Sequence, residues 1–238
     1  MKKQSALRLY SMVGKYWPAL LLAYVLTFLQ KGDRMVAMQD LYGGTYGFLR
    51  NEMPRLGVDV GFVPTTDPAE LCAAIDPRTK VVYLESPTNP LLKLIDIRET
   101  CRLAHEKGCL VMIDNTFASP VNQRPLELGA DLVVYSATKY LGGHSDVTAG
   151  FVLGAGEVVT PVWNWRKNLG SMIGPATASL LARSLRTLVV RVRQQNESAQ
   201  RIAEAMTRHP KVTRVFYPGL ASFPGHDLAR EQMYGFGG

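Results

Sequence analysis

The sequence predicts an α/β fold in which helices sandwich a mostly parallel sheet. Short apolar runs of strand length alternate with segments of helical pattern from Arg34 to Leu153, and this alternation is typical of βαβ units. The chain has 238 residues, of which 47% are apolar and 20% charged. A chain of this length and composition is globular, with one domain or one domain and part of another.

The expected strands are apolar runs in which β-branched residues are frequent. Five of them have the length of buried strands: residues 34–38, 58–63, 80–84, 110–113 and 132–135. A shorter run follows at residues 151–153. Because helical segments separate most of these runs, we expect the strands to pair in parallel.

Helices are expected in three of the connections: from a turn at residues 41–45 through Met53, over residues 68–75, and from residue 97 to Gly108. Asp67 precedes the second helix as an N-cap. Asp96 precedes the third helix, and Glu99 lies three positions after it, as in a capping box. The third helix also has apolar residues at helical spacing, at Ile97, Cys101 and Ala104.

The pattern changes after residue 153. Residues 176–206 have a long helical pattern that we expect to form more than one helix, and His209-Pro210 ends it. Residues 170–175 are expected to form a loop, and residues 212–217 a strand.

The chain begins with Met-Lys-Lys, and an apolar run follows at Ala19–Leu29. Arg8 and Lys15 interrupt any resemblance to a signal peptide, and the run is too short to span a bilayer, which needs roughly 20 residues. A helix that begins after Trp17-Pro18 is the better interpretation, since proline is favoured in a first helical turn. We therefore expect no membrane segment.

Residues 131–146 contain the densest group of candidate site residues. Ser136, Thr138 and Lys139 directly follow an expected strand, at the strand end where open α/β sheets bind ligands. Hydroxyls suit phosphate oxygens, and a lysine in a dry pocket can attack a carbonyl. The alternative is an ordinary Ser/Thr-rich loop with a solvated lysine, since four-residue matches are common.

Asp114 closes the preceding strand and favours the functional interpretation. A carboxylate at the end of a buried strand is costly unless a cation or hydrogen-bond donors meet it. A protonated pyridine nitrogen is such a partner, and enzymes that use pyridoxal phosphate pair an Asp with that nitrogen and form a Schiff base with a Lys. We predict that Asp114 binds the ring nitrogen and Lys139 the aldehyde carbon, while Ser136 and Thr138 bind the phosphate.

Four longer stretches resemble the motifs of one enzyme family: Tyr-Leu-Glu-Ser-Pro-Thr-Asn-Pro at residues 83–90, Ile-Asp-Asn-Thr-Phe at 113–117, Gln-Arg-Pro-Leu-Glu-Leu-Gly-Ala-Asp at 123–131, and Tyr-Ser-Ala-Thr-Lys-Tyr-Leu-Gly-Gly-His-Ser-Asp at 135–146. This is the Cys/Met-metabolism family of pyridoxal phosphate enzymes. It includes cystathionine γ-synthase, cystathionine β- and γ-lyases, methionine γ-lyase and the O-acylhomoserine sulfhydrylases. The resemblance extends from about Lys31 to Gly238.

The resemblance implies an aspartate-aminotransferase-like large domain, which we place at residues 1–188. Residues 189–238 would begin a small C-terminal α+β domain, so the chain is expected to be truncated. The implied activity is β/γ-elimination or γ-replacement on sulfur amino acids or O-acylhomoserine, of the cystathionine γ-synthase or cystathionine lyase type. The implied partners are a small-molecule amino-acid substrate and further copies of the chain, in a dimer or tetramer.

The resemblance also implies roles for two loop residues. Tyr42 matches a family tyrosine that stacks on the cofactor ring and takes part in proton transfer. Asn89 matches an asparagine that hydrogen-bonds the phenolic oxygen of the cofactor. Without the resemblance, Tyr42 would be interpreted as a residue packed in a turn. Thr-Asn-Pro would be interpreted as a sequence that is common in turns. Thr116 lies two residues after Asp114, so it should face the same side and cover the opposite face of the ring.

Composition argues against several other classes of function. The net charge is +7, but lysine and arginine are scattered rather than gathered in a stripe, so nucleic acid is not an expected partner. The four histidines, His144 included, have no spacing typical of metal ligands, and no metal is expected there or at Asp146. The three cysteines have no such spacing either, and their odd number indicates a reducing cytoplasm.

The N-terminal region departs from the family pattern. A Ser-Gly-(Met or Leu)-Ala turn of the family, whose backbone N–H groups bind the phosphate, corresponds here to Tyr16-Trp17-Pro18-Ala19. Proline has no N–H to donate, so we expect weak phosphate binding that depends mainly on Ser136 and Thr138. We also expect little or no turnover by this chain alone, so one alternative is a catalytically impaired fragment or a non-enzymatic homologue with the same fold. A second alternative is an aminotransferase-like enzyme on the same general fold, which the Tyr-Gly-Gly-Thr and Ser-Ala-Thr-Lys motifs disfavour.

Overall fold

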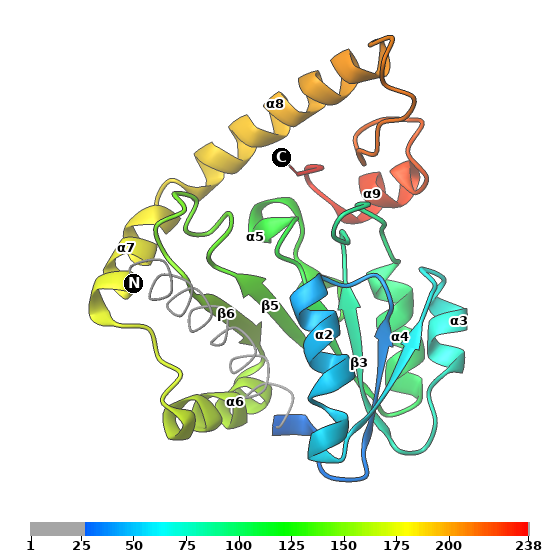
Figure 1. Cartoon of the computed structure of the whole chain (residues 1–238), viewed down its shortest axis with the longest axis vertical. Helices are drawn as coiled ribbons and strands as arrows, with labels where there is room; N and C mark the ends of the chain where they lie inside the picture. Colours follow the sequence, from blue (N-terminus) through cyan, green and yellow to red (C-terminus); the bar gives the residue numbers. More distant parts are fainter. Residues whose placement is uncertain (1–26, 238) are drawn as a thin grey trace, which may run out of the picture.

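The computed structural model of the protein describes residues 27–237. A six-stranded sheet in the order β2-β1-β3-β4-β5-β6 forms its centre (Figure 1). The strands are β1 (Arg34–Met38), β2 (Asp59–Val63), β3 (Thr79–Glu85), β4 (Leu110–Asp114), β5 (Leu132–Ser136) and β6 (Gly150–Gly154). The first five pair in parallel and β6 pairs antiparallel with β5, so the predicted α/β class with a mostly parallel sheet is confirmed.

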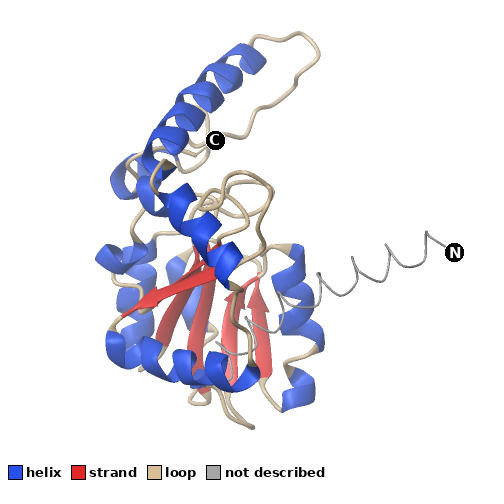
Figure 2. Cartoon of the chain, turned by 90° about the vertical axis from the view of Figure 1, so that its left-hand side faces the viewer, coloured by secondary structure: helices blue, strands red, loops and turns tan. Residues whose placement is uncertain are grey.

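Helices cover both faces of the sheet (Figures 1 and 2), with α2 on one face and α3 and α4 on the other. They are α2 (Gly43–Asn51), α3 (Pro68–Ala73), α4 (Ile97–Glu106), α5 (Ser119–Asn122), α6 (Gly156–Leu169), α7 (Pro175–Leu185), α8 (Leu188–Thr207) and α9 (His226–Gln232), with short 3-10 turns η1 (Pro54–Leu56) and η2 (Pro125–Leu128). The chain moves from β1 to β2 in one direction along the sheet, and from β2 to β3, β4 and β5 in the other. Because crossovers between parallel strands are right-handed, the two directions place their helices on opposite faces.

The predicted helix starts are confirmed by their caps. The Asp67 carboxylate accepts from the N–H groups of Ala69 at 2.7 Å and Glu70 at 3.1 Å. The Asp96 carboxylate accepts from the Glu99 N–H at 3.0 Å, while the Glu99 side chain pairs with Arg102. The start of α4 is therefore an N-cap with only half of the capping box.

The core lies where the central strands meet the helices. Side chains on both faces of β1, β3 and β4 are buried, which is why these strands appear in the sequence as continuous apolar runs. Helix α4 buries its apolar stripe, as its spacing predicted, at Ile97, Cys101 and Ala104. All three cysteines are buried and unpaired.

The region after β6 differs from the sequence prediction in three places. Residues 212–217 form no strand, because no strand of the described chain lies alongside to supply a ladder of hydrogen bonds. Helix α6 was not expected, since Pro161 lies inside it and interior prolines disfavour helices. The short helix α9 was not expected either. The predicted helical segments α7 and α8 and the loop between α6 and α7 are confirmed.

The helix expected to begin after Trp17-Pro18, and the departure from the family pattern at residues 16–19, lie outside the described residues. Between residues 27 and 237, no helix combines the length and the apolar character that a membrane span requires.

Segments distant in sequence meet near the carboxyl ends of the strands through buried amides (Figure 1). The Gln232 side chain in α9 donates to the Ile95 carbonyl at 3.0 Å and accepts from the Ile97 N–H at 3.3 Å. The Gln123 side chain donates to the Gln232 carbonyl and accepts from the Asn115 side chain. Residues 226–232 are thereby tied to the strand end that carries Asp114.

Replacing Ile113 with Ala should lower the free energy of unfolding by about 2–5 kcal/mol, because the side chain is 0% exposed and its loss leaves a cavity. Urea unfolding measures the change. The same substitution at Ile202, which is 61% exposed on α8, is the matched control and should change stability by less than about 0.5 kcal/mol. Equal losses at the two positions would contradict the assigned core.

Candidate functional site

The carboxyl ends of the parallel strands bring most of the predicted site residues to one edge of the sheet. Glu85 ends β3, Asp114 ends β4 and Ser136 ends β5. Glu85 and Asp114 are register partners, so their side chains lie on the same face of the sheet. Asp114 pairs in turn with Val134, which puts Ser136 two residues further along that face.

The direction of chain progression reverses between β1 and β3. Strand β2 lies on one side of β1, whereas β3, β4 and β5 follow on the other. Open α/β sheets bind ligands in the crevice at such a switch point. Tyr42 follows β1 and Asn89 follows β3, so the two loops that carry these residues diverge at the switch point.

Asp114 is the central buried charge of this edge. Its side chain is 6% exposed, one carboxylate oxygen accepts from the Thr116 N–H at 2.9 Å, and burial raises the pKa of the carboxyl group. Within residues 27–237 no cationic side chain pairs with it. A buried carboxylate without a cation suits a ligand that supplies one, and the protonated ring nitrogen of pyridoxal phosphate has this chemistry.

Thr116 joins the ends of two neighbouring strands. Its N–H donates to Asp114, and its hydroxyl oxygen accepts from the Ser136 N–H at 2.8 Å. The structure therefore brings Asp114, Thr116 and Ser136 together, in agreement with the expectation that Thr116 lies on the Asp114 side.

Lys139 lies in a tight turn directly after β5. The Lys139 N–H donates to the Ser136 carbonyl at 3.1 Å, and the Gly142 N–H donates to the Ala137 carbonyl at 2.8 Å. The Lys139 side chain is exposed and the Ser136 side chain partly exposed. The Thr138 hydroxyl, by contrast, accepts from the Ala149 N–H at 3.2 Å and so ties the turn to the segment that enters β6.

The Tyr42 and Asn89 loops are held together by one side chain that the sequence analysis did not single out. Glu85 accepts from the Tyr42 N–H at 2.6 Å through Oε2, and from the Asn89 N–H at 2.9 Å through Oε1. Its sequence signal was the same as that of Asp114, a carboxylate at the end of an apolar strand. Burial, and then the neighbouring Asp114, raise the pKa of Glu85 to about 8.

The Tyr42 ring is half exposed at the mouth of this edge. It is 45% exposed and lies against Gly44, where a Cβ would come within 2.6 Å of the ring carbon Cε1. Gly44 therefore permits the close approach of the ring to the start of α2. Beneath them, the Tyr83 side chain is fully buried, and burial raises the pKa of its hydroxyl.

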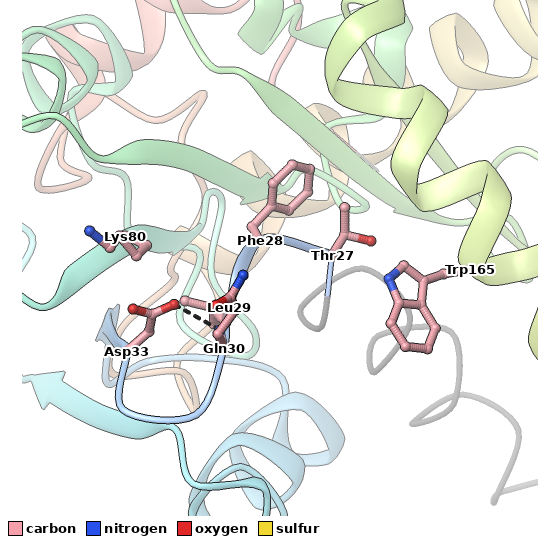
Figure 3. A pocket seen from close by; sticks show the side chains of 7 residues that line it. All are labelled: Thr27, Phe28, Leu29, Gln30, Asp33, Lys80 and Trp165. Atoms are coloured by element: carbon pink, nitrogen blue, oxygen red, sulfur yellow. Dashed lines mark hydrogen bonds between the residues drawn. The ribbon is translucent and has the colours of Figure 1, made fainter.

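Two further features contribute no predicted site residue. His144 and Asp146 are exposed, and no metal-binding group of three or more His, Cys, Asp or Glu side chains occurs between residues 27 and 237. A cavity of about 660 Å³ lies at the opposite, amino end of the strands (Figure 3). Its lining consists of Thr27, Phe28, Leu29, Gln30, Asp33, Lys80 and Trp165, none of which is a predicted site residue.

Comparison with known proteins decides the family. Residues 18–238 match the family model described as "Cys/Met metabolism PLP-dependent enzyme". The chain belongs to this family. Pyridoxal phosphate, the cofactor predicted from the sequence, is thus confirmed as the cofactor of the family.

Relatives within the family are enzymes of sulfur amino-acid metabolism. The chain is 45% identical over 215 residues to a probable cystathionine gamma-synthase of Herpetosiphon aurantiacus, with 90% of the chain and 67% of the relative covered. It is 46% identical to an L-methionine gamma-lyase of Treponema denticola, over 85% of the chain and 51% of that enzyme. The transsulfuration class expected from the sequence is therefore the class of these relatives.

A solved structure confirms the predicted aspartate-aminotransferase-like fold. The chain superimposes on a cystathionine gamma-lyase from Lactobacillus plantarum, crystallised with L-serine, with a TM-score of 0.89 at 38% identity. The match covers 92% of the chain and 58% of the crystallised one. The chain thus spans roughly half to two thirds of the length of these three relatives.

The raised pKa of Glu85 predicts a stability that depends on pH in the cofactor-free chain. The pKa rises from the ordinary value of 4.5 to about 8 on folding, so the folded state binds the proton more tightly. Protonation of Glu85 therefore contributes fully to the free energy of unfolding below about pH 4.5, and this contribution is lost as the pH rises through about 8. Relative to Glu85→Gln, the wild type should lose a free energy of unfolding on the order of a few kcal/mol across this window.

Urea unfolding at about pH 5, 6.5 and 8.5 measures the difference. Asp67→Asn makes the same acid-to-amide change at the exposed cap of α3 and serves as the control. Parallel pH profiles for the wild type and Glu85→Gln would contradict the raised pKa.

Proposed function

We propose that this chain is the cofactor-binding part of a pyridoxal phosphate-dependent transsulfuration enzyme. The enzyme acts on sulfur amino acids or O-acylhomoserine by β/γ-elimination or γ-replacement, as a cystathionine γ-synthase or a cystathionine lyase does. The observation that carries the proposal is Asp114, a buried carboxylate that pairs with no cationic side chain within residues 27–237, at the sheet edge where the Lys139 turn also lies. Family membership and the names of the relatives support it.

The residues at this edge have complementary roles in the proposal. Asp114 holds a proton on the ring nitrogen, because its buried negative charge favours the pyridinium form. Lys139 would hold the aldehyde carbon of the cofactor, and its Nζ would serve as the general base for the α-proton of the substrate. When bound, the cofactor supplies an electron sink for the resulting carbanion.

The remaining residues orient the cofactor. Tyr42 stacks on one face of the ring and takes part in proton transfer, while Thr116 covers the other face. Asn89 hydrogen-bonds the phenolic oxygen. Ser136 and Thr138 bind the phosphate, and Thr138 must then exchange or share its hydrogen bond with Ala149.

The proposal includes the domain division and the assembly. Helix α7 ends at Leu185 and α8 begins at Leu188, which supports a boundary between a large domain, residues 1–188, and the start of a small one, residues 189–238. A homo-oligomer, dimer or tetramer, is supported by large apolar side chains exposed on α6, α7 and α8 and between them: Trp163, Trp165, Leu169, Met172, Ile173, Leu180, Leu185, Val189 and Val190. The three unpaired thiols support a cytoplasmic location.

Pyridoxal phosphate added to the chain should form a covalent link with Lys139 and a yellow absorbance band. Borohydride reduction followed by peptide mapping should locate the pyridoxyl group on that residue. Lys139→Ala should abolish the band, whereas Lys211→Ala, at an exposed position after α8, should retain it. A label on another lysine, with Lys139→Ala still yellow, would exclude the assigned role.

Asp114→Asn should affect α-proton exchange and stability in opposite directions. The cofactor-free variant should be at least as stable as the wild type, because burial raises the pKa of this carboxyl group and an amide carries no charge. With cofactor and substrate, the variant should lose several kcal/mol of barrier lowering for α-proton exchange, since a preorganised charge is removed from a dry site. Thermal melting and exchange of the α-proton with deuterium measure the two effects. Unchanged exchange in the variant would exclude this role.

A further inference from the structure

Glu85 is a buried carboxyl group to which the proposed chemistry assigns no task. It is 5% exposed, and no cationic side chain between residues 27 and 237 pairs with it. We propose that Glu85 is a positioning residue, whose two carboxyl oxygens hold the Tyr42 turn and the Asn89 turn together across the switch-point crevice. This inference rests on the proposed function, because that function makes Tyr42 and Asn89 contacts of the cofactor.

Each oxygen of Glu85 serves one of the two turns. Oε2 accepts from the Tyr42 N–H at 2.6 Å, and Oε1 accepts from the Asn89 N–H at 2.9 Å. Tyr42 is the residue before α2, whereas Asn89 lies in the connection between β3 and α4. The two turns therefore belong to different connections, which lead to helices on opposite faces of the sheet (Figure 1). Glu85 therefore joins backbone segments that no ladder of strand hydrogen bonds holds together.

The contact acts on the backbone, which is why it determines where the Tyr42 ring lies. The ring is half exposed, so packing restrains it only in part. Its position depends instead on the backbone of residue 42 and on the space that Gly44 leaves open. Fixing the Tyr42 N–H thus orients the ring without contact to the ring itself.

A carboxyl group is suited to this task because it has two acceptor oxygens at a fixed separation. An amide of the same shape has one oxygen, so Gln at this position satisfies one turn and directs an NH₂ group at the other donor. Asp has both oxygens but is shorter by one methylene and cannot reach as far. A carboxyl group keeps acceptor capacity on both oxygens when protonated, so the raised pKa of Glu85 is compatible with the contact.

A second contact joins the same loops at the surface but is weaker. The Lys93 ammonium lies 2.6 Å from the Asp40 carboxylate, and both side chains are exposed. Exposed ion pairs contribute about 1 kcal/mol or less and are screened by salt. The buried carboxyl of Glu85 is not screened in this way, so it is the principal tie between the two turns.

Hydrogen exchange of the cofactor-free chain tests the inference. In Glu85→Gln, the backbone amides of the Tyr42 turn, the Asn89 turn or both should exchange at least about tenfold faster, which corresponds to one lost hydrogen bond. The melting temperature should stay the same or rise, because the amide removes a buried acid beside Asp114. Glu85→Asp retains the carboxyl group but not the reach, and should also exchange faster in at least one turn. Asp67→Asn, a matched loss of an acid that accepts two backbone N–H groups, should leave both turns unchanged.

The positioning role is wrong if both turns exchange in Glu85→Gln as in the wild type, or if exchange rises equally throughout the chain with a lower melting temperature. It is also wrong if Glu85→Asp behaves as the wild type, since the distance that the Glu85 side chain spans would then not determine how the turns are held. Titration with pyridoxal phosphate should show about tenfold weaker binding by Glu85→Gln, with reduction still labelling Lys139. A wild-type chain that binds no pyridoxal phosphate would contradict the proposed function, while the exchange result would still decide the role of Glu85.

Discussion

The register between β3 and β4 is the constraint on which the site depends. Because Glu85 pairs with Asp114, two carboxyl groups end neighbouring parallel strands on the same face of the sheet. A slip of one residue in either strand would move one of them to the opposite face, since side chains alternate along a strand. The buried apolar residues on both faces of β3 and β4 make such a slip costly. The register that packs the core is therefore also the register that places the two acids.

Two neighbouring buried acids destabilise the cofactor-free sheet edge, and the fold contains no cation in residues 27–237 that offsets them. The two carboxyl groups differ in what they contact. Asp114 accepts from the loop that follows its own strand, whereas Glu85 spans two loops. Asp114 is thus available to a cationic ligand, while Glu85 organises the surrounding backbone. Functional sites often retain local instability of this kind.

The sequence predicted the elements that have strong periodic patterns and clear caps. All five parallel strands and the starts of α3 and α4 lie where apolar runs and the residues Asp67 and Asp96 indicated. The strand expected at residues 212–217 failed because a strand needs a neighbour, which an apolar pattern does not reveal. Helix α6 was missed because Pro161 lowers its local propensity. Among the candidate site residues, Asp114, Thr116 and Ser136 lie together as expected, whereas the hydrogen bond from Ala149 to Thr138 and the two-loop contact of Glu85 depend on tertiary packing.

The strand order also has a consequence for how the chain folds. No two parallel neighbours are joined by a tight turn: Met112 of β4 pairs with Leu132 of β5, and Arg34 of β1 pairs with Thr79 of β3 across the whole of β2 and α3. Long loops must close before these ladders contribute any free energy, so folding is slow and dominated by contacts distant in sequence. The crevice between the Tyr42 and Asn89 loops requires the β1–β3 pair, which has the largest sequence separation in the sheet. We therefore expect the edge that carries the candidate site to be among the last parts of the sheet to assemble, and no short fragment of the chain would contain it.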